Sequence, residues 1–113
     1  MSDVLEQLAE ILKHRRDGDP EESYVASLHH KGLNKILEKV GEEATEVILA
    51  ARDVDQGADN KIVVGEVADL WFHTLVMLSH LDLDACAVLE CLEDRFGVSG
   101  IAEKTARDAG NKS

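Results

Sequence analysis

The segment from Lys61 to Leu81 constrains the fold most, because it is apolar on almost every side of the helix that it predicts. A helix of this kind must be covered all round. A chain of 113 residues has only a modest core with which to cover it. We therefore expect a second copy of the chain to bury part of this helix. Its apolar positions are Ile62, Val63, Val64, Val67, Leu70, Trp71, Phe72, Leu75, Val76, Met77 and Leu78.

Other segments with apolar residues at helical spacing predict further helices. They cover about 3–15, 23–32 and 33–51, and a last helix is capped by Asp82 or Asp84 and closed by Gly97. In that last helix Val88, Leu89, Leu92 and Phe96 are expected to face inward. A single proline and an excess of Ala, Leu and Glu also favour helices over sheets. The prediction is one all-α domain over residues 1–113, a bundle of four to five helices completed by dimerisation, with a polar C-terminal tail over about 98–113.

The charge balance excludes several classes of partner. A formal net charge of −11 disfavours binding to nucleic acid or to anionic lipid.

The opening MSDVLEQLAE lacks the basic start and apolar run of a signal peptide, and no segment is expected to reach the apolar length of a membrane span. Cys86 and Cys91 are best explained as reduced thiols, so a cytoplasmic location is expected.

Two groups of carboxylates carry the chemistry. Glu66 and Asp69 lie on one face of the apolar helix, where an unpaired carboxylate is expensive to bury. Glu42, Glu43 and Glu46 share a sector of the preceding long helix, and alone they would suit a solvated face. If the two helices are antiparallel neighbours, both groups meet and form an oxygen-only site that suits Mg²⁺ or Mn²⁺ rather than zinc.

Basic residues near these carboxylates are candidates for binding an anionic substrate. Lys35 and Lys39 lie in the same helical sector, one to two turns earlier, although they could equally form salt bridges with glutamates. Lys31, Arg52 and Lys61 lie nearer the helix ends and complete the set of candidates.

The histidines are interpreted differently from one another. His73 continues the face of the second carboxylate group, either as a hydrogen-bonded core residue or as a substrate contact. His14, His29 and His30 are expected at the surface, and His80 at a helix end. The sequence contains neither a glycine-rich phosphate loop nor a zinc-ligand pair, and it offers no obvious activated serine or cysteine. Hydrolysis by a metal-activated water is the simplest mechanism that remains.

The order Glu-Glu-x-x-Glu, nineteen residues, then Glu-x-x-Asp resembles the all-helical nucleoside triphosphate pyrophosphatase superfamily. The segments KILEKVGEEATEV and RFGVSGIAEK are more specifically similar to the phosphoribosyl-ATP pyrophosphatase family of histidine biosynthesis. The resemblance covers nearly the whole chain. It implies cleavage of phosphoribosyl-ATP between its α and β phosphates, giving phosphoribosyl-AMP and pyrophosphate. It also implies Mg²⁺, a homodimer and a cytoplasmic enzyme acting on a small nucleotide substrate.

The same resemblance assigns roles to individual residues. It implies that Glu43, Glu46, Glu66 and Asp69 hold Mg²⁺, with Glu42 as a further ligand or as the residue that orients water. Lys35 and Lys39 would meet phosphates, whereas Asn34 and Trp71 depart from the family pattern without touching these positions.

Two alternatives stay open. One is a house-cleaning pyrophosphatase of the same superfamily that acts on free nucleotides, and the other is a non-catalytic helical dimer whose acidic stripe is merely solvated.

Overall fold

Residues 2–97 form five α-helices and no strand in the computed structural model, which describes this part of the chain. The helices are α1 (Ser2–Arg16), α2 (Tyr24–Lys31), α3 (Leu33–Asp55), α4 (Asn60–His80) and α5 (Ala85–Phe96). The all-α prediction is therefore confirmed. The expected tail over 98–113, which includes most of RFGVSGIAEK, lies outside the described residues.

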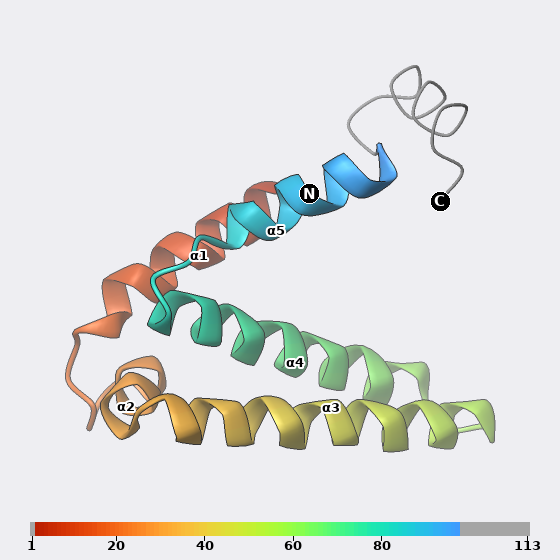
Figure 1. The fold of residues 1–113 in the computed structure, drawn as a ribbon. Coiled ribbons are helices and arrows are strands. Elements are labelled where there is room, and N and C mark those ends of the chain that lie inside the picture. The colour runs from red at the N-terminus through yellow and green to blue at the C-terminus, as the bar shows by residue number, and fades with distance from the viewer. Residues whose placement is uncertain (1, 98–113) are drawn as a thin grey trace.

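The helices form a V (Figure 1). The antiparallel pair α3 and α4 makes one arm, α1 and α5 together make the other, and α2 lies at the closed end. Among the five described helices the contact between α3 and α4 is the most extensive, whereas α4 and α5 touch only sparsely. One arm is thus well packed, and the space between the arms is open.

Capping residues fix the helix ends. Side-chain oxygens of Ser23, Asp59 and Asp84 accept hydrogen bonds from the first backbone N–H groups of α2, α4 and α5. Asp84, rather than Asp82, is therefore the cap of the last helix. Gly32 and Gly97 end α2 and α5 with φ of 101° and 61°, values that favour glycine.

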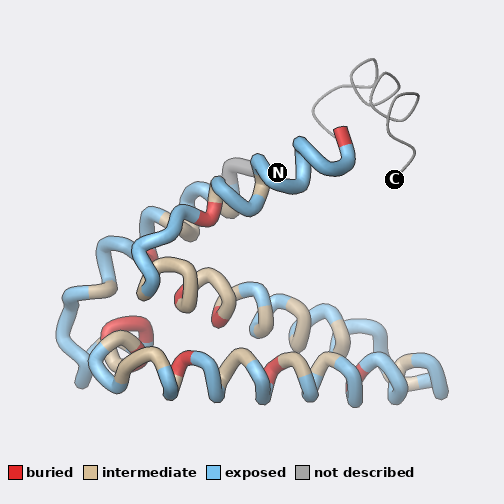
Figure 2. The backbone as a smooth tube through the Cα atoms, viewed as in Figure 1, coloured by how far each residue is buried: buried red, intermediate tan, exposed pale blue. Residues whose placement is uncertain are grey.

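The core lies where four helices meet at the closed end of the V. Leu12 of α1, Val25 and Leu28 of α2, Ile36 of α3 and Val76 of α4 are all buried and pack together. Figure 2 shows that the buried residues of α4 lie toward its end at the closed side of the V. The described residues thus enclose a core at one end only.

Apolar side chains line the open space between the arms. Val88, Leu92 and Phe96 of α5 are 43–54% exposed, so the expectation that they face inward is wrong for a single chain. Trp71 of α4 is 58% exposed beside them. A groove of about 500 Å³ lies here, lined by Leu5, Trp71, Thr74, Leu75, Met77, Leu78, Ala85, Val88, Leu89 and Leu92. The helices α4 and α5 diverge, so their apolar faces do not cover one another.

One sequence-based expectation about α4 needs correction. By length and composition, Asn60–His80 reaches what a membrane-spanning helix requires, although we expected no segment to do so. The central helix of a helical protein meets the same requirement, and one side of α4 packs against α3. Length and apolarity alone therefore do not decide what covers its other side.

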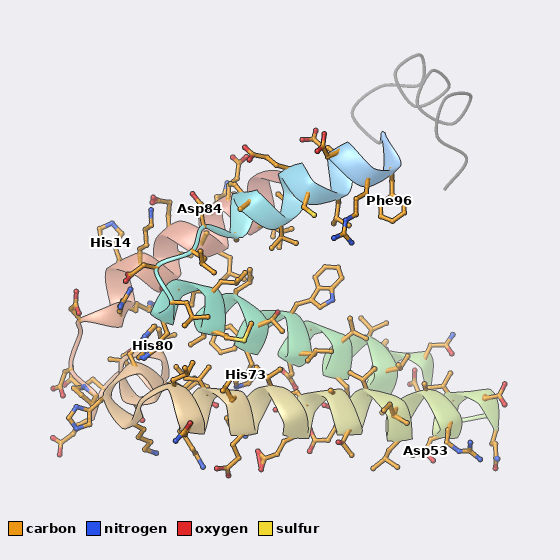
Figure 3. The ribbon with its side chains drawn as sticks, in the orientation of Figure 1. His14, Asp53, His73, His80, Asp84 and Phe96 are labelled. Carbon is orange, nitrogen blue, oxygen red and sulfur yellow. The ribbon has the colours of Figure 1, made fainter. Side chains whose placement is uncertain are left out.

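Polar contacts hold the ends of α1, α2 and α4 together. Arg16 donates to the Ser79 carbonyl oxygen at 2.6 Å and pairs with Asp82 at 2.7 Å. The Nδ1 atoms of His29 and His80 lie 2.9 Å apart, so the expectation that His29 is a simple surface residue is wrong. Figure 3 shows His80 beside α2.

The geometry of the two histidine rings identifies the contact as a hydrogen bond. The ring planes differ by 20° and the centroids are 5.1 Å apart. Rings stacked face to face could not bring two atoms to 2.9 Å, so His29 and His80 meet edge to edge. One Nδ1 must donate while the other accepts, and this bond is lost when both rings carry a full set of protons.

Acidification is expected to weaken the fold through His29. Burial lowers its pKa below 6.5, Arg16 and His80 lower it further, and Asp17 opposes them. The unfolded chain therefore binds a proton more readily, so the contribution of neutral His29 is present above about pH 6.5 and is lost as the pH falls. Urea unfolding of the wild type and of His29→Gln at equal protein concentration, at several pH values, measures the difference. Parallel pH profiles for the two proteins would contradict this account.

Candidate metal centre

Three glutamates meet between the antiparallel helices α3 and α4. Glu43 and Glu46 lie one turn apart on α3, and Glu66 comes from the facing side of α4. One carboxylate oxygen from each lies within 4.8 Å of the other two. The structure therefore gathers three of the four carboxylates that the resemblance assigns to magnesium, and we call these three residues the carboxylate cluster.

Glu43 is the buried member of the carboxylate cluster. Only 7% of its surface is exposed, and its Oε2 atom has no hydrogen-bond partner. Burial raises the pKa of Glu43 to about 7, the neighbouring carboxylates of Glu46 and Asp69 add to the rise, and Lys39 opposes it. A buried, unpartnered carboxylate oxygen is costly in free energy unless something positive meets it.

The other carboxylates surround Glu43. Partial removal from water raises the pKa of Glu66, and the negative charges of Glu46 and Asp69 raise it further. Asp69 is exposed and lies one turn beyond Glu66, close enough to act on both Glu43 and Glu66. It adjoins the carboxylate cluster without belonging to the set of oxygens within 4.8 Å.

The donor set fits a hard divalent cation. All the converging atoms are carboxylate oxygens, which Mg²⁺ and Mn²⁺ prefer, and histidine and cysteine are absent from the carboxylate cluster. A cation there would give the orphaned Glu43 oxygen a partner and relieve the mutual repulsion of the carboxylates. The residues present are thus suited to the magnesium ion that the resemblance implies.

Lys39 is the basic residue that the structure places beside the carboxylate cluster. Its Nζ lies 3.2 Å from Glu42 and 3.9 Å from Glu43. Glu42 is itself exposed and turned toward Lys39, and it is not one of the three converging glutamates. Lys35, one turn earlier, pairs with Glu38 at 3.3 Å instead. Of these two lysines, Lys39 is therefore the one that lies beside the carboxylate cluster.

The remaining basic candidates lie toward the helix ends. Lys31 is the last residue of α2, Arg52 lies in the last turn of α3, and Lys61 is the second residue of α4. Arg52 follows Glu46 by six residues, which is about 9 Å along the helix axis. All three are exposed, and no salt bridge joins any of them to Glu43, Glu46 or Glu66.

His73 is buried, and both of its ring nitrogens are engaged. Nδ1 lies 2.7 Å from the Asp69 carbonyl oxygen, and Nε2 lies 2.8 Å from the Tyr24 hydroxyl. Figure 3 shows His73 between α4 and α3. These contacts match the first of the two roles considered for His73, that of a hydrogen-bonded core residue.

Tyr24 was not among the residues singled out from the sequence. Its partner His73 is 49 residues away, and helical spacing carries no information about a contact at that separation. Two features of the sequence could have drawn attention to Tyr24. It is the only tyrosine in the sequence, and it directly follows a serine that caps a helix.

The fold and the site together define a class: an all-helical protein with a carboxylate cluster suited to a divalent cation between two antiparallel helices. The family model described as phosphoribosyl-ATP pyrophosphohydrolase matches residues 5–96. The chain belongs to this family, whose name indicates a hydrolase of histidine biosynthesis. The match includes the carboxylate cluster, Asp69, Lys39 and Tyr24.

Proposed function

We propose that the chain hydrolyses phosphoribosyl-ATP to phosphoribosyl-AMP and pyrophosphate in histidine biosynthesis, in the presence of Mg²⁺. The observation that carries the proposal is the buried, unpartnered Glu43 oxygen within a cluster of three glutamates. That arrangement occurs in a chain matched over residues 5–96 by the family model. A solvated acidic face, by contrast, would give no reason to bury one carboxylate among others.

Each residue of the site has a proposed task. Glu43, Glu46 and Glu66 would hold the cation, with Asp69 beside them on α4. Bound there, Mg²⁺ would polarise phosphate oxygens and offset their negative charge.

The residues around the cation would bind the substrate and orient water. Lys39 would bind a phosphate at the edge of the carboxylate cluster, which offsets the repulsion that a chain of net charge −11 exerts on an anion. Glu42 is exposed and adjacent to Glu43, and it is not one of the three converging glutamates. Its task would be to orient a water molecule.

The test compares pyrophosphate release from phosphoribosyl-ATP, ATP and the deoxynucleoside triphosphates under the same Mg²⁺ concentration. We expect release from phosphoribosyl-ATP with much higher kcat/KM than from any free nucleotide. Preference for a free nucleotide would instead assign the chain to the house-cleaning branch of the superfamily. Release from none of these substrates would favour the non-catalytic helical dimer.

We also propose that a second copy of the chain covers the apolar groove between the arms of the V. The groove is about 500 Å³, and the side chains that line it include the exposed Trp71 and Leu92. Exposed apolar area of this kind usually marks an interface. We propose a cytoplasmic location for this homodimer. We propose neither a membrane nor a nucleic acid as its partner.

Light scattering on the purified chain tests the dimer. We expect a mass of twice 12.4 kDa at micromolar concentration, and a shift toward the single-chain mass for Trp71→Asp, because a charge in the interface core is costly to desolvate. A matched change at an exposed site outside the groove, Ala51→Asp on α3, should leave the mass unchanged. A wild type that stays at 12.4 kDa would contradict the proposal.

A further inference from the structure

A cavity of about 520 Å³ lies where the end of α1, the following loop, the start of α2 and the middle of α4 meet. We call it the α2 pocket. Its apolar wall includes Tyr24 and Phe72, and its polar wall includes Arg15, Asp19 and Glu22. The glutamates of the carboxylate cluster lie outside it. The α2 pocket therefore has both an aromatic surface and charged groups of either sign.

The aromatic wall offers a flat surface to a ligand. The ring of Tyr24 lies nearly parallel to that of Phe72, with the planes 18° apart and the centroids separated by 6.1 Å. Because Phe72 adjoins one side of the ring and 51% of Tyr24 is exposed, aromatic surface remains accessible from the pocket. Planar bases of nucleotides stack on surfaces of this kind.

Hydrogen bonds fix this surface close to the carboxylate cluster. The Tyr24 hydroxyl lies 2.8 Å from His73 Nε2, and His73 Nδ1 lies 2.7 Å from the carbonyl oxygen of Asp69, which adjoins the cluster. Phe72 follows Glu66 by six residues, or about 9 Å along the axis of α4. The phosphates and ribose of a nucleotide can span such a distance. A ligand with its phosphates at the carboxylate cluster can therefore reach the α2 pocket.

Arg15 gives the α2 pocket an uncommitted positive charge. Within residues 2–97, no salt bridge or side-chain hydrogen bond engages its guanidinium. The adjacent Arg16, by contrast, donates to the Ser79 carbonyl oxygen and pairs with Asp82. A guanidinium binds phosphate through two parallel hydrogen bonds. Arg15 is thus available for a phosphate, whereas Arg16 serves the fold.

Asp19 and Glu22 add carboxylates to the same pocket. Their loop is held by its own hydrogen bonds, since Asp19 Oδ1 accepts from the Glu21 N–H at 2.9 Å and the Asp19 carbonyl oxygen accepts from the Glu22 N–H at 3.0 Å. Two carboxylates beside one guanidinium do not suit a simple anion, because their charges repel it. They do suit a sugar phosphate, since carboxylates accept hydrogen bonds from hydroxyl groups.

We infer that the α2 pocket binds the phosphoribosyl end of the substrate, with Tyr24 stacked on the base and Arg15 paired with the terminal phosphate of the attached ribose. The aromatic, cationic and acidic groups of the pocket match the base, the phosphate and the hydroxyls of that end. The inference rests on the proposed function and deepens it, because the phosphoribosyl group is what phosphoribosyl-ATP has and ATP lacks. Arg15 is then the residue that distinguishes the two substrates.

Steady-state kinetics of the full chain with Mg²⁺ test the inference by comparing phosphoribosyl-ATP with ATP. Arg15→Met removes the charge and keeps much of the side-chain length. We expect it to lower kcat/KM for phosphoribosyl-ATP roughly 10- to 100-fold, the factor for losing a hydrogen bond to a charged group, and to leave the low value for ATP unchanged. Lys13→Met is the matched control. It removes the same charge from α1, but Lys13 lines a different cavity, so both values should stay as in the wild type.

Calorimetric binding of phosphoribosyl-AMP and of AMP, each with Mg²⁺, gives a second readout that does not need turnover. We expect the wild type to bind phosphoribosyl-AMP more tightly than AMP, and Arg15→Met to lose most of that preference. Tyr24→Leu, which removes the aromatic surface, should weaken the binding of both ligands, whereas Tyr24→Phe, which keeps it, should bind both nearly as the wild type does.

A wild-type preference for phosphoribosyl-AMP that persists in Arg15→Met would overturn the inference, as would equal affinity of the wild type for the two ligands. Equal losses of kcat/KM for phosphoribosyl-ATP and ATP in Arg15→Met would overturn it too, because they indicate a general structural defect. A wild type that prefers phosphoribosyl-AMP but releases no pyrophosphate from phosphoribosyl-ATP would overturn the proposed function instead.

Discussion

Replacing Glu46 by glutamine is expected to lower kcat/KM for pyrophosphate release by more than about 100-fold, because even groups that only support metal ligands cost 10- to 100-fold when removed. Glu46 is the member of the carboxylate cluster that raises the pKa of both Glu43 on its own helix and Glu66 on the facing helix. Glutamine keeps the shape of the side chain and removes the charge, so the helices should form as before.

The matched control for Glu46→Gln is Asp53→Asn. Asp53 lies on the same helix, at its far end, and its side chain is exposed (Figure 3). It loses the same unit of charge, so any general effect of net charge appears in both variants. Circular dichroism should show equal helicity in all three proteins. Glu46→Gln with wild-type turnover would show that Glu46 does not serve the reaction.

Magnesium is expected to stabilise the protein strongly, and more at about pH 8 than at about pH 6. The pKa of Glu43 is about 7 in the fold against an ordinary 4.5, so the folded state binds a proton more tightly than the unfolded chain. The stability from protonated Glu43 is fully present below 4.5 and is lost as the pH rises through about 7. Above that pH, a bound cation replaces the missing proton.

Thermal unfolding with and without Mg²⁺, at matched ionic strength and protein concentration, measures this effect. At a concentration of 100 times Kd, the gain is about 2.7 kcal/mol for a single site. Glu43→Gln, which removes the buried charge, should be more stable than the metal-free wild type at about pH 8 and should lose most of its response to Mg²⁺. The same rise in Tm for both proteins, or an equal rise with potassium chloride, would contradict the assignment of the site.

The sequence was enough to predict what depends on local periodicity and capping. Helices α2 and α5 end at Gly32 and Gly97, where the backbone turns left-handed, and both ends follow from glycine after an apolar periodic run. The three-residue spacing of Glu66 and Asp69 likewise places them on one face of α4. These are properties of one helix at a time.

Contacts between helices distant in sequence could not be predicted in the same way. The pairs Tyr24–His73 and His29–His80 join α2 to α4 across 49 and 51 residues. They depend on how the helices pack at the closed end of the V. Helical spacing also could not say that Glu43 would be buried while Glu46, in the same sector, stays exposed. That difference depends on the position of α4 against α3.

The apolar residues of α5 show a further limit. Val88 and Leu92 repeat at helical spacing, which indicates a buried face but not the molecule that buries it. In the single chain the two arms diverge, and these side chains remain 43–44% exposed. Periodicity identifies a surface that needs a partner, and only packing shows that the partner is not α4 of the same chain.

The rate of pyrophosphate release from phosphoribosyl-ATP, measured as Mg²⁺ is added back to chelator-stripped protein, tests the central claim most directly. We predict no release in chelator and a saturating recovery with Mg²⁺ in the wild type. Release that persists in chelator, or no release at any Mg²⁺ concentration, would contradict a magnesium-dependent pyrophosphohydrolase centred on Glu43, Glu46 and Glu66.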